Sequence, residues 1–225
     1  MKSILKSSLR VVAFVVLIVG LSASSVSAEL LVKWDFESDD NPSETSASMQ
    51  GTGMSSSGLN LVDRYDFNYT NTISSWVYGF QAMGAGADTS AWTNDYIEFT
   101  VSSGSSSPNF TIESIDMDPF WIRVGDPSRR SDTDFYLLSS DDGFASSLGV
   151  YVMPDVSATS RSAEWSHTYD LSSSSLAGKK FSTITFRLYA LAANYATTKS
   201  INGRTGFDNL TVNGHIDRGT VILIE

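Results

Sequence analysis

The sequence predicts an all-β protein, an antiparallel two-sheet β-sandwich. Beyond residue 28 the chain is rich in Ser, Thr, Gly and Asn, and its apolar residues come in short alternating runs without helical spacing. Turn-rich pieces separate these runs, at 38–58, 102–109, 125–132, 141–149, 172–180 and 193–206. Strands with one apolar face that are joined by such turns bury those faces by packing as two antiparallel sheets.

The first predicted strand opens the domain. Its residues alternate between an apolar set, Leu30, Val32, Trp34 and Phe36, and a mostly polar set, Leu31, Lys33, Asp35 and Glu37. A second strand alternates in the same way around Ile97, Phe99 and Val101. Further strands are predicted at 135–140, 165–171, 184–189 and 210–212. The alternation places Trp34, Phe99 and Phe186 in the core.

The segment 110–118 contains two alternation phases. Phe110 and Ile112 share one phase, whereas Ile115 and Met117 share the other. This change of phase predicts a bulge or a turn at residues 113–114.

Length, charge and cysteine content exclude several classes of function. The 225 residues suit one domain. The first 28 residues carry three basic and no acidic side chains, which leaves 12 basic and 25 acidic side chains, a net charge of −13, on the rest. Such a charge repels phosphate backbones and anionic lipid headgroups, so no nucleic-acid partner is expected. Without cysteine, the chain has no disulfide, thiolate zinc site or thiol nucleophile.

The amino terminus has the pattern of a signal peptide. Lys2, Lys6 and Arg10 precede an apolar run of 11 residues and a small-residue end at Ala28. A membrane-spanning helix needs about 20 apolar residues, so a membrane anchor is disfavoured. We expect a signal peptide at 1–28, a secreted β-sandwich domain at 29–214, a C-terminal tail at 215–225 and no transmembrane segment in the mature chain.

Five motifs occur in an order that is typical of one family of exported bacterial proteins. They are Leu31–Phe36, Asp95–Val101, Leu138–Phe144, Thr185–Tyr189 and Phe207–Val212. Together they resemble the largely uncharacterised β-sandwich proteins that often carry a PEP-CTERM sorting segment. The resemblance covers most of 30–214 and implies a jelly-roll-like sandwich similar to carbohydrate-binding modules, with no assigned activity. The 11 residues after Gly214 contain no Pro-Glu-Pro, so the resemblance does not extend to the sorting segment.

The sequence predicts no enzyme. His167 shares a strand face with Trp165 and Tyr169, which favours a hydrogen-bonded strand residue over a catalytic base. His215 lies in the expected tail, and the chain has no Gly-x-Ser-x-Gly elbow.

A glycoside hydrolase of sandwich fold is the catalytic alternative. Retaining hydrolysis needs two carboxyl groups about 5 Å apart on the same side of the sugar. Glu113 stands at odd spacing from Asp116 and Asp118, so a regular strand would place it on the opposite face. A bulge in this strand would restore the alignment.

Aromatic side chains near the turn-rich pieces are the candidate ligand contacts. Trp76, Tyr78, Trp92 and Trp121 are of this kind, and an exposed indole or phenol ring stacks on sugar rings. The guanidinium groups of Arg129 and Arg130 can bind a carboxylate or a sulfate. The alternative is that the aromatics belong to the core and that the arginines form a solvated loop pair.

These observations predict a non-catalytic surface or matrix protein that binds an extracellular polysaccharide. The alternative is a structural exported protein without a specific ligand. A binding module needs two or more coplanar aromatics around a groove, whereas a structural protein buries nearly all its aromatics and exposes Ser and Thr.

Asp208 raises the question of a structural calcium ion. It has the parity of Leu210 and Val212, so a regular strand turns its carboxylate toward the core, where it needs backbone donors, an arginine or a metal ion. Asp35 and Glu37 on the opening strand are possible further oxygen ligands. We expect a hydrogen-bonded structural aspartate, with calcium as the alternative.

Overall fold

The computed structural model describes residues 27–35, 46–62, 78–80, 96–104, 109–123, 133–154, 162–192 and 203–218. At 61–62, 78–80, 121–123, 133, 162–163, 191–192 and 203–205 it describes the backbone alone. Residues 1–26 of the predicted signal peptide lie outside these ranges. Within them, no helix has the length and apolar character needed to cross a membrane.

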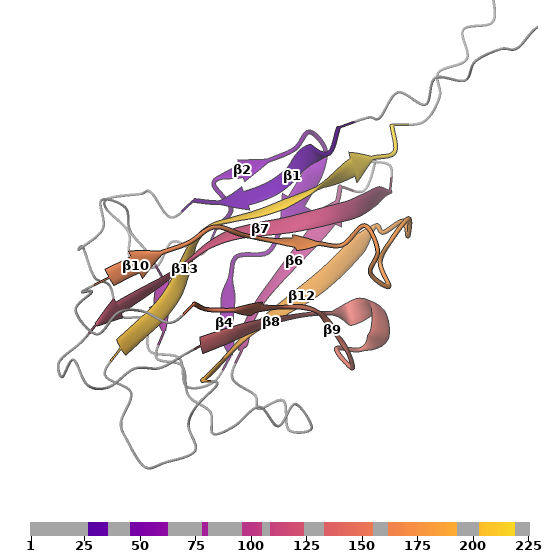
Figure 1. The fold of residues 1–225 in the computed structure, drawn as a ribbon. Coiled ribbons are helices and arrows are strands. Elements are labelled where there is room, and N and C mark those ends of the chain that lie inside the picture. The colour runs from indigo at the N-terminus through magenta and orange to yellow at the C-terminus, as the bar shows by residue number, and fades with distance from the viewer. Residues whose placement is uncertain are drawn as a thin grey trace, which may run out of the picture.

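Two antiparallel sheets make up the fold (Figure 1). Sheet A has the order β10-β7-β13-β1-β2, with β11 also paired to β7 and β5 paired to β13. Its strands are β1 (Glu29–Trp34), β2 (Met49–Gln50), β5 (Tyr78–Phe80), β7 (Phe110–Arg123), β10 (Ser162–Glu164), β11 (His167–Asp170) and β13 (Gly203–Ile216).

Sheet B has the order β3-β6-β12-β8-β9, with β4 also paired to β6. Its strands are β3 (Met54–Ser56), β4 (Asn60–Val62), β6 (Tyr96–Ser103), β8 (Thr133–Ser139), β9 (Ser147–Val152) and β12 (Thr183–Ala192). A short 3-10 helix, η2 (Ser140–Asp142), follows β8.

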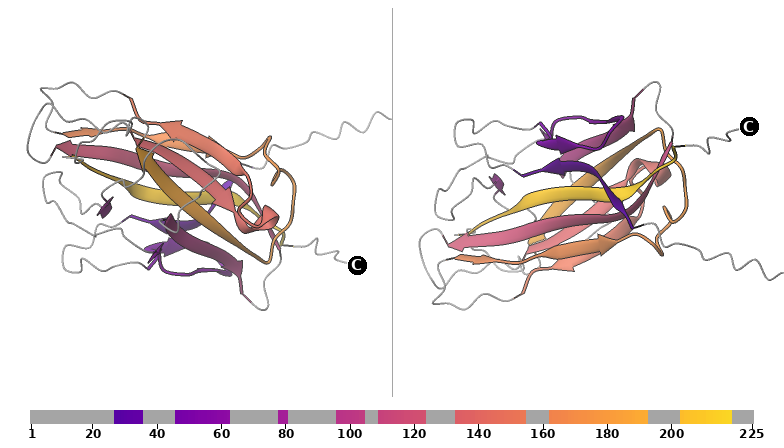
Figure 2. Two further views of the ribbon diagram at one scale, coloured as in Figure 1. Left: turned by 90° about the horizontal axis from the view of Figure 1, so that it is seen from below. Right: turned by 90° about the horizontal axis from the view of Figure 1, so that it is seen from above.

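Eight of these strands have the jelly-roll arrangement. Sheet A contains β1-β13-β7-β11 side by side, and sheet B contains β6-β12-β8-β9. Taken in chain order, these eight strands change sheet at every step except the β8–β9 hairpin. The two views of Figure 2 show the strands as two stacked layers. The predicted all-β two-sheet sandwich is therefore confirmed.

The core lies between the two sheets and contains the aromatics that the alternation predicts. Trp34, Phe99 and Phe186 are fully buried. The Phe99 ring has its centroid 5.3 Å from that of Trp34 on sheet A and 5.3 Å from that of Phe186 on sheet B. Aromatic contacts at this distance add to the burial of apolar area, so these rings join the two sheets.

Bulges change the predicted alternation at two places. In β1 the register against β13 shifts between Leu30 and Val32, so Leu31, predicted on the polar side, is fully buried. In β7 the register shifts beside Ser114, which confirms the predicted bulge at 113–114.

Some boundaries differ from prediction. The short strands β2 and β3 lie in the segment 38–58 that was predicted as turns. β13 continues to Ile216, and His215 pairs with Thr111. The first two residues of the expected tail are therefore strand residues.

Candidate functional site

Most of the predicted ligand contacts fall outside the described residues. This holds for Trp76, Trp92, Arg129 and Arg130, and also for Glu37. For the remaining two the backbone is placed: Tyr78 pairs with Phe207, and Trp121 pairs with Thr205 and Ala163. No side-chain position is described for either.

The strands that flank these residues meet at one end of the sandwich, which we call the loop end. β6 and β8 begin there, and β5 and β7 end there. The register supports this placement, because Arg123 at the end of β7 pairs with Gly203, and Thr133 at the start of β8 pairs with Ala192. Figure 1 shows these strand ends at the lower left.

A line of three tyrosines crosses the outer face of sheet B near the loop end. Tyr96 on β6, Tyr189 on β12 and Tyr136 on β8, which we call the tyrosine row, lie in register across neighbouring strands. Exposed Val150 on β9 continues the line. Tyr96 and Tyr136 are half-buried, and Tyr189 is 2% exposed. The Tyr96 and Tyr189 ring centroids are 5.4 Å apart with the ring planes tilted by 52°.

Arg187 lies beside the tyrosine row with its guanidinium group held by several contacts. Its Nε donates a hydrogen bond to Oε2 of Glu98 at 2.9 Å. Its Cζ lies 4.1 Å from the centroid of the Tyr96 ring and 3.8 Å from that of Phe144. Leu138, directly across on β8, is fully buried. Because both rings lie this close to Cζ, the guanidinium group is held between two aromatic rings, in a geometry that favours cation–π attraction.

The turn after β8 positions the Phe144 ring with a strained backbone. Phe144 has φ 62, in the left-handed region that costs a bulky residue about 1–3 kcal/mol. The turn is closed by hydrogen bonds from the Phe144 N–H to the Ser139 carbonyl at 2.9 Å and from the Ala145 and Ser146 N–H groups to the Asp142 carboxylate. These bonds hold a conformation that phenylalanine disfavours by itself.

On the outer face of sheet B, burial and neighbouring groups determine the charge states of Tyr136 and Arg187. Burial, together with Asp134, raises the pKa of Tyr136. Burial by itself would lower the pKa of Arg187, but side-chain hydrogen bonds to Glu98 and Tyr189 and the nearby tyrosines outweigh it, so this pKa is raised. At neutral pH the Tyr136 phenol is therefore protonated and Arg187 is charged.

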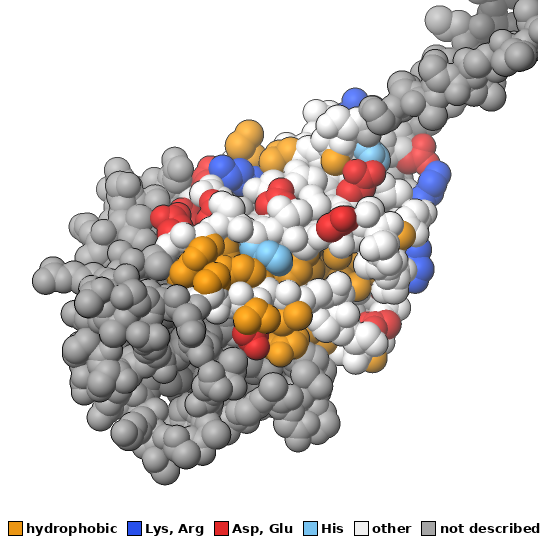
Figure 3. Space-filling view, in the orientation of Figure 1, with side chains coloured by type: hydrophobic (Ala, Val, Ile, Leu, Met, Phe, Trp, Pro, Cys, Tyr) orange, Lys and Arg blue, Asp and Glu red, His pale blue; other side chains and the backbone are white. Residues whose placement is uncertain are grey.

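The outer face of sheet A is acidic. In a regular strand, odd spacing would turn Glu113 away from Asp116 and Asp118, but the predicted bulge is present and restores the alignment. The bulge beside Ser114 adds one residue to β7 and shifts the alternation, so all three carboxylates share the outer face. Figure 3 shows acidic side chains spread over the upper half of the view, where Figure 1 places β7, β13 and β1.

Neighbouring polar groups satisfy these carboxylates. The contacts are Glu113 with His215 Nε2 at 2.7 Å, Asp116 with Asn213 Nδ2 at 2.7 Å, and Asp118 with Ser166 Oγ at 2.7 Å and Asn209 Nδ2 at 3.0 Å. Such contacts are typical of a structural polar surface. Within the described ranges, no group of three or more His, Asp or Glu side chains is placed to hold a metal ion.

Asp208 is buried as predicted, at 3% exposure, but it faces the other way. Asn209 has φ 49 and adds one residue to β13, and this bulge places Asp208 opposite Asp118 on the outer side of the sheet. Asp208 Oδ1 accepts a hydrogen bond from the Asn209 N–H at 2.7 Å, in keeping with a structural aspartate. Asp35 directly follows β1, and its Oδ2 lies 4.0 Å from Lys33 Nζ. The calcium alternative stays a prediction.

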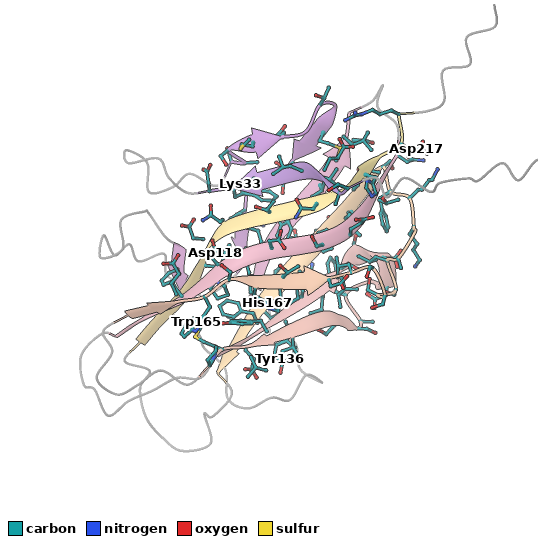
Figure 4. All side chains as sticks on the ribbon, turned by 45° about the horizontal axis from the view of Figure 1, so that its top comes forward. Lys33, Asp118, Tyr136, Trp165, His167 and Asp217 are labelled. Atoms are coloured by element: carbon teal, nitrogen blue, oxygen red, sulfur yellow. The ribbon has the colours of Figure 1, made fainter. Side chains whose placement is uncertain are left out.

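An aromatic cluster closes the edge between β11 and β9, where Figure 4 labels His167 next to Trp165. The His167 ring lies 4.6 Å from that of Tyr151 and 4.5 Å from that of Tyr169. The Tyr169 hydroxyl donates to the Phe135 carbonyl at 2.9 Å and so joins the two sheets. His167 is a strand residue of β11 as predicted, and its Nε2 is buried with no hydrogen-bond partner among the described residues.

His167 predicts a loss of stability in acid. Burial lowers its pKa from 6.5, against an opposing effect of Asp116. Below pH 6.5 the unfolded chain therefore binds more protons at this site than the folded chain does. As the pH decreases from 6.5 to the folded-state pKa, the free energy of unfolding decreases with it. Thermal melts at pH 7.5 and 5.5 should show a larger acid loss in the wild type than in His167→Phe, which keeps a ring at this position. Equal losses in both proteins would contradict this account.

The tyrosine row was missed by sequence reasoning. Each tyrosine is on a different strand, and only the strand order and register bring them together. The available signal was an aromatic residue at the polar phase of a strand, such as Tyr96 beside Ile97 and Tyr136 beside Phe135. That signal identifies single residues, whereas a site needs their arrangement.

No protein-family model matches the chain, and no curated protein matches it. Several solved structures show a distant likeness. The CBM22-1 xylan-binding domain of Paenibacillus barcinonensis Xyn10C has 11% identity and a TM-score of 0.37 over 84% of this chain and 96% of that chain. The xylan-binding module CBM15 has 9% identity and a TM-score of 0.35 over 69% of this chain and 88% of that chain.

The K3 adhesin domain of Lys-gingipain from Porphyromonas gingivalis W83 has 12% identity and a TM-score of 0.30 over 61% of this chain and 74% of that chain. At these scores the likeness does not identify a ligand for this chain.

Proposed function

We propose that this chain is an exported, non-catalytic β-sandwich that binds an extracellular polysaccharide through the tyrosine row. The observation that carries the proposal is the line of three phenol rings across β6, β12 and β8. Tyr96 and Tyr136 are half-buried and thus present part of their surface to a ligand. A phenol combines an apolar face with a hydroxyl group, which suits both stacking on a sugar ring and hydrogen bonding to it.

The direction of the row favours a polymer. Tyr96 and Tyr136 lie two strand spacings apart, about 10 Å. Exposed Val150 extends the line by one more strand. A ligand that contacts Tyr96, Tyr136 and Val150 therefore crosses the strands of sheet B, passes over the buried Tyr189 and contains several linked sugar units.

A structural protein without a specific ligand is the second candidate. Two observations favour it: most of the described aromatics are buried, and the Tyr96 and Tyr189 rings are tilted instead of coplanar. The hydrogen-bonded polar face of sheet A also fits a protein that packs within an extracellular layer. This candidate predicts no binding to any glycan.

The proposal gives the carboxylates of sheet A no catalytic role. Glu113 is paired with His215, and the amide of Asn213 bonds Asp116. We therefore expect no cleavage of glycans by the protein. Export and removal of residues 1–28 belong to the same proposal, and the mass of the exported protein, beginning at Glu29, tests them.

Replacing Tyr136 by alanine should weaken polysaccharide binding about tenfold, equivalent to about 1.4 kcal/mol, because the row loses one stacking surface. Arg187 keeps its contacts with Tyr96, Phe144 and Glu98 in this variant. Affinity electrophoresis against arabinoxylan, mannan, mixed-linkage β-glucan, dextran, alginate and polygalacturonate measures the effect.

The matched control is Thr168→Ala, a change on the exposed face of β11 in sheet A that should bind as the wild type does. Binding by the wild type that survives in Tyr136→Ala would remove the tyrosine row from the proposal. A wild type that binds none of the six polymers would favour the structural candidate.

A further inference from the structure

Beside the tyrosine row, the guanidinium group of Arg187 is held from both sides of β12. Glu98 and Tyr96 come from β6 on one side, and Phe144 comes from the turn beyond β8 on the other. A planar guanidinium between two rings has fewer orientations available than a free one, so its donors keep a fixed direction.

The Phe144 contact is maintained against backbone strain. Phe144 has φ 62, which glycine adopts at no cost, and its ring is half-buried outside the core cluster. The hydrogen bonds of the turn hold this backbone, and the conformation places the ring over Arg187 at 3.8 Å. Strained residues of this kind are often found where they position a functional group.

The Arg187 and Glu98 pair offers complementary hydrogen-bonding chemistry in one place. Their side chains are 25% and 27% exposed, so both reach the surface of sheet B. A guanidinium group donates hydrogen bonds, and a carboxylate accepts them. Sugar hydroxyl groups both donate and accept, so two neighbouring hydroxyls can use the two partners together.

The charges of Arg187 and Glu98 together favour neutral ligands over acidic ones. Glu98 compensates the charge of Arg187, which leaves little attraction for a carboxylate or a sulfate. The net charge of −13 that remains after residues 1–28 adds a general repulsion of polyanions.

We propose that the Arg187–Glu98 pair is the specificity element of the tyrosine row and that it selects neutral polysaccharides by bonding adjacent hydroxyl groups. This inference rests on the proposed function and adds a ligand class and a polar anchor to it. Phe144 acts as a positioning residue, because it holds the guanidinium group and does not itself need to touch the sugar.

Two variants test the anchor with the six polymers named above. Arg187→Lys keeps the positive charge but loses the planar fork of donors, and Phe144→Gly removes the ring while its backbone becomes unstrained. Both should bind the preferred polymer at least tenfold more weakly than the wild type, with melting temperatures close to that of the wild type. Thr168→Ala is again the matched control.

The ligand class is tested with one polysaccharide in two forms, the neutral polymer and its carboxymethylated derivative. The wild type should prefer a neutral polymer of the six, and its affinity should fall at least tenfold when the same polymer is carboxymethylated. Tighter binding to alginate, to polygalacturonate or to the carboxymethylated form would overturn the assignment to neutral polysaccharides.

The outcomes separate this inference from the proposed function. If Tyr136→Ala loses binding while Arg187→Lys and Phe144→Gly bind as the wild type does, the tyrosine row stands and the anchor is refuted. If the wild type binds no polymer, both are refuted. If Phe144→Gly is unstable, Arg187→Lys decides whether the anchor stands.

Discussion

Replacing Gly214 by alanine should destabilise the domain by about 3 kcal/mol or more, because the new methyl group has no space. A Cβ at this position would lie 1.9 Å from the Thr111 carbonyl oxygen and 3.0 Å from the Ile112 Cα, both backbone atoms of β7. Backbone atoms within a paired strand cannot rotate away, so β7 and β13 would have to separate at the bulge. Chemical denaturation of the mature domain measures the loss.

Gly178→Ala is the matched control for this change. Gly178 has φ 68, and a Cβ there meets nothing within 4 Å, so alanine costs only the left-handed backbone, about 1–2 kcal/mol. If Gly214→Ala were no more destabilising than Gly178→Ala, the close approach of β13 to β7 would be wrong.

Replacing Phe99 by alanine should cost about 3–5 kcal/mol, since it leaves a cavity between the sheets. The ring is fully buried, with an edge-on contact to Trp34 at 5.3 Å and a stacked contact to Phe186 at 5.3 Å. A loss of this size lowers the melting temperature by roughly 2–4 °C for each kcal/mol.

The control for Phe99→Ala is a change to an exposed side chain of the same sheet. Val150 on β9 is 46% exposed, and Val150→Ala should change stability by no more than about 0.5 kcal/mol. Similar melting temperatures for Phe99→Ala and the wild type would mean that the ring does not join the two sheets.

Strand positions and core aromatics were predictable because alternation is a local property of the chain. Trp34, Phe99 and Phe186 are buried as expected, and the bulge at 113–114 was visible as a change of phase in the apolar residues. Local patterns of this kind do not need the partner strand.

Features that depend on a partner strand were not predictable. The bulge at Asn209 reverses the expected direction of Asp208, and its trace in the sequence is a single odd spacing, between the buried Phe207 and Leu210. Gly214 looked like the end of the domain, whereas its role is to let β13 approach β7 opposite a bulge. The tyrosine row needs the register of three strands at once.

The central claim, that the outer face of sheet B binds a polysaccharide, is tested most directly by mapping the contact residue by residue. Amide resonances of the mature domain would be followed during titration with oligosaccharides of the preferred polymer. The account predicts saturable shifts centred on Tyr96, Tyr136, Arg187 and Tyr189, with the strands of sheet A little affected. Shifts confined to β7 and β13, or no shifts with any polymer, would contradict it.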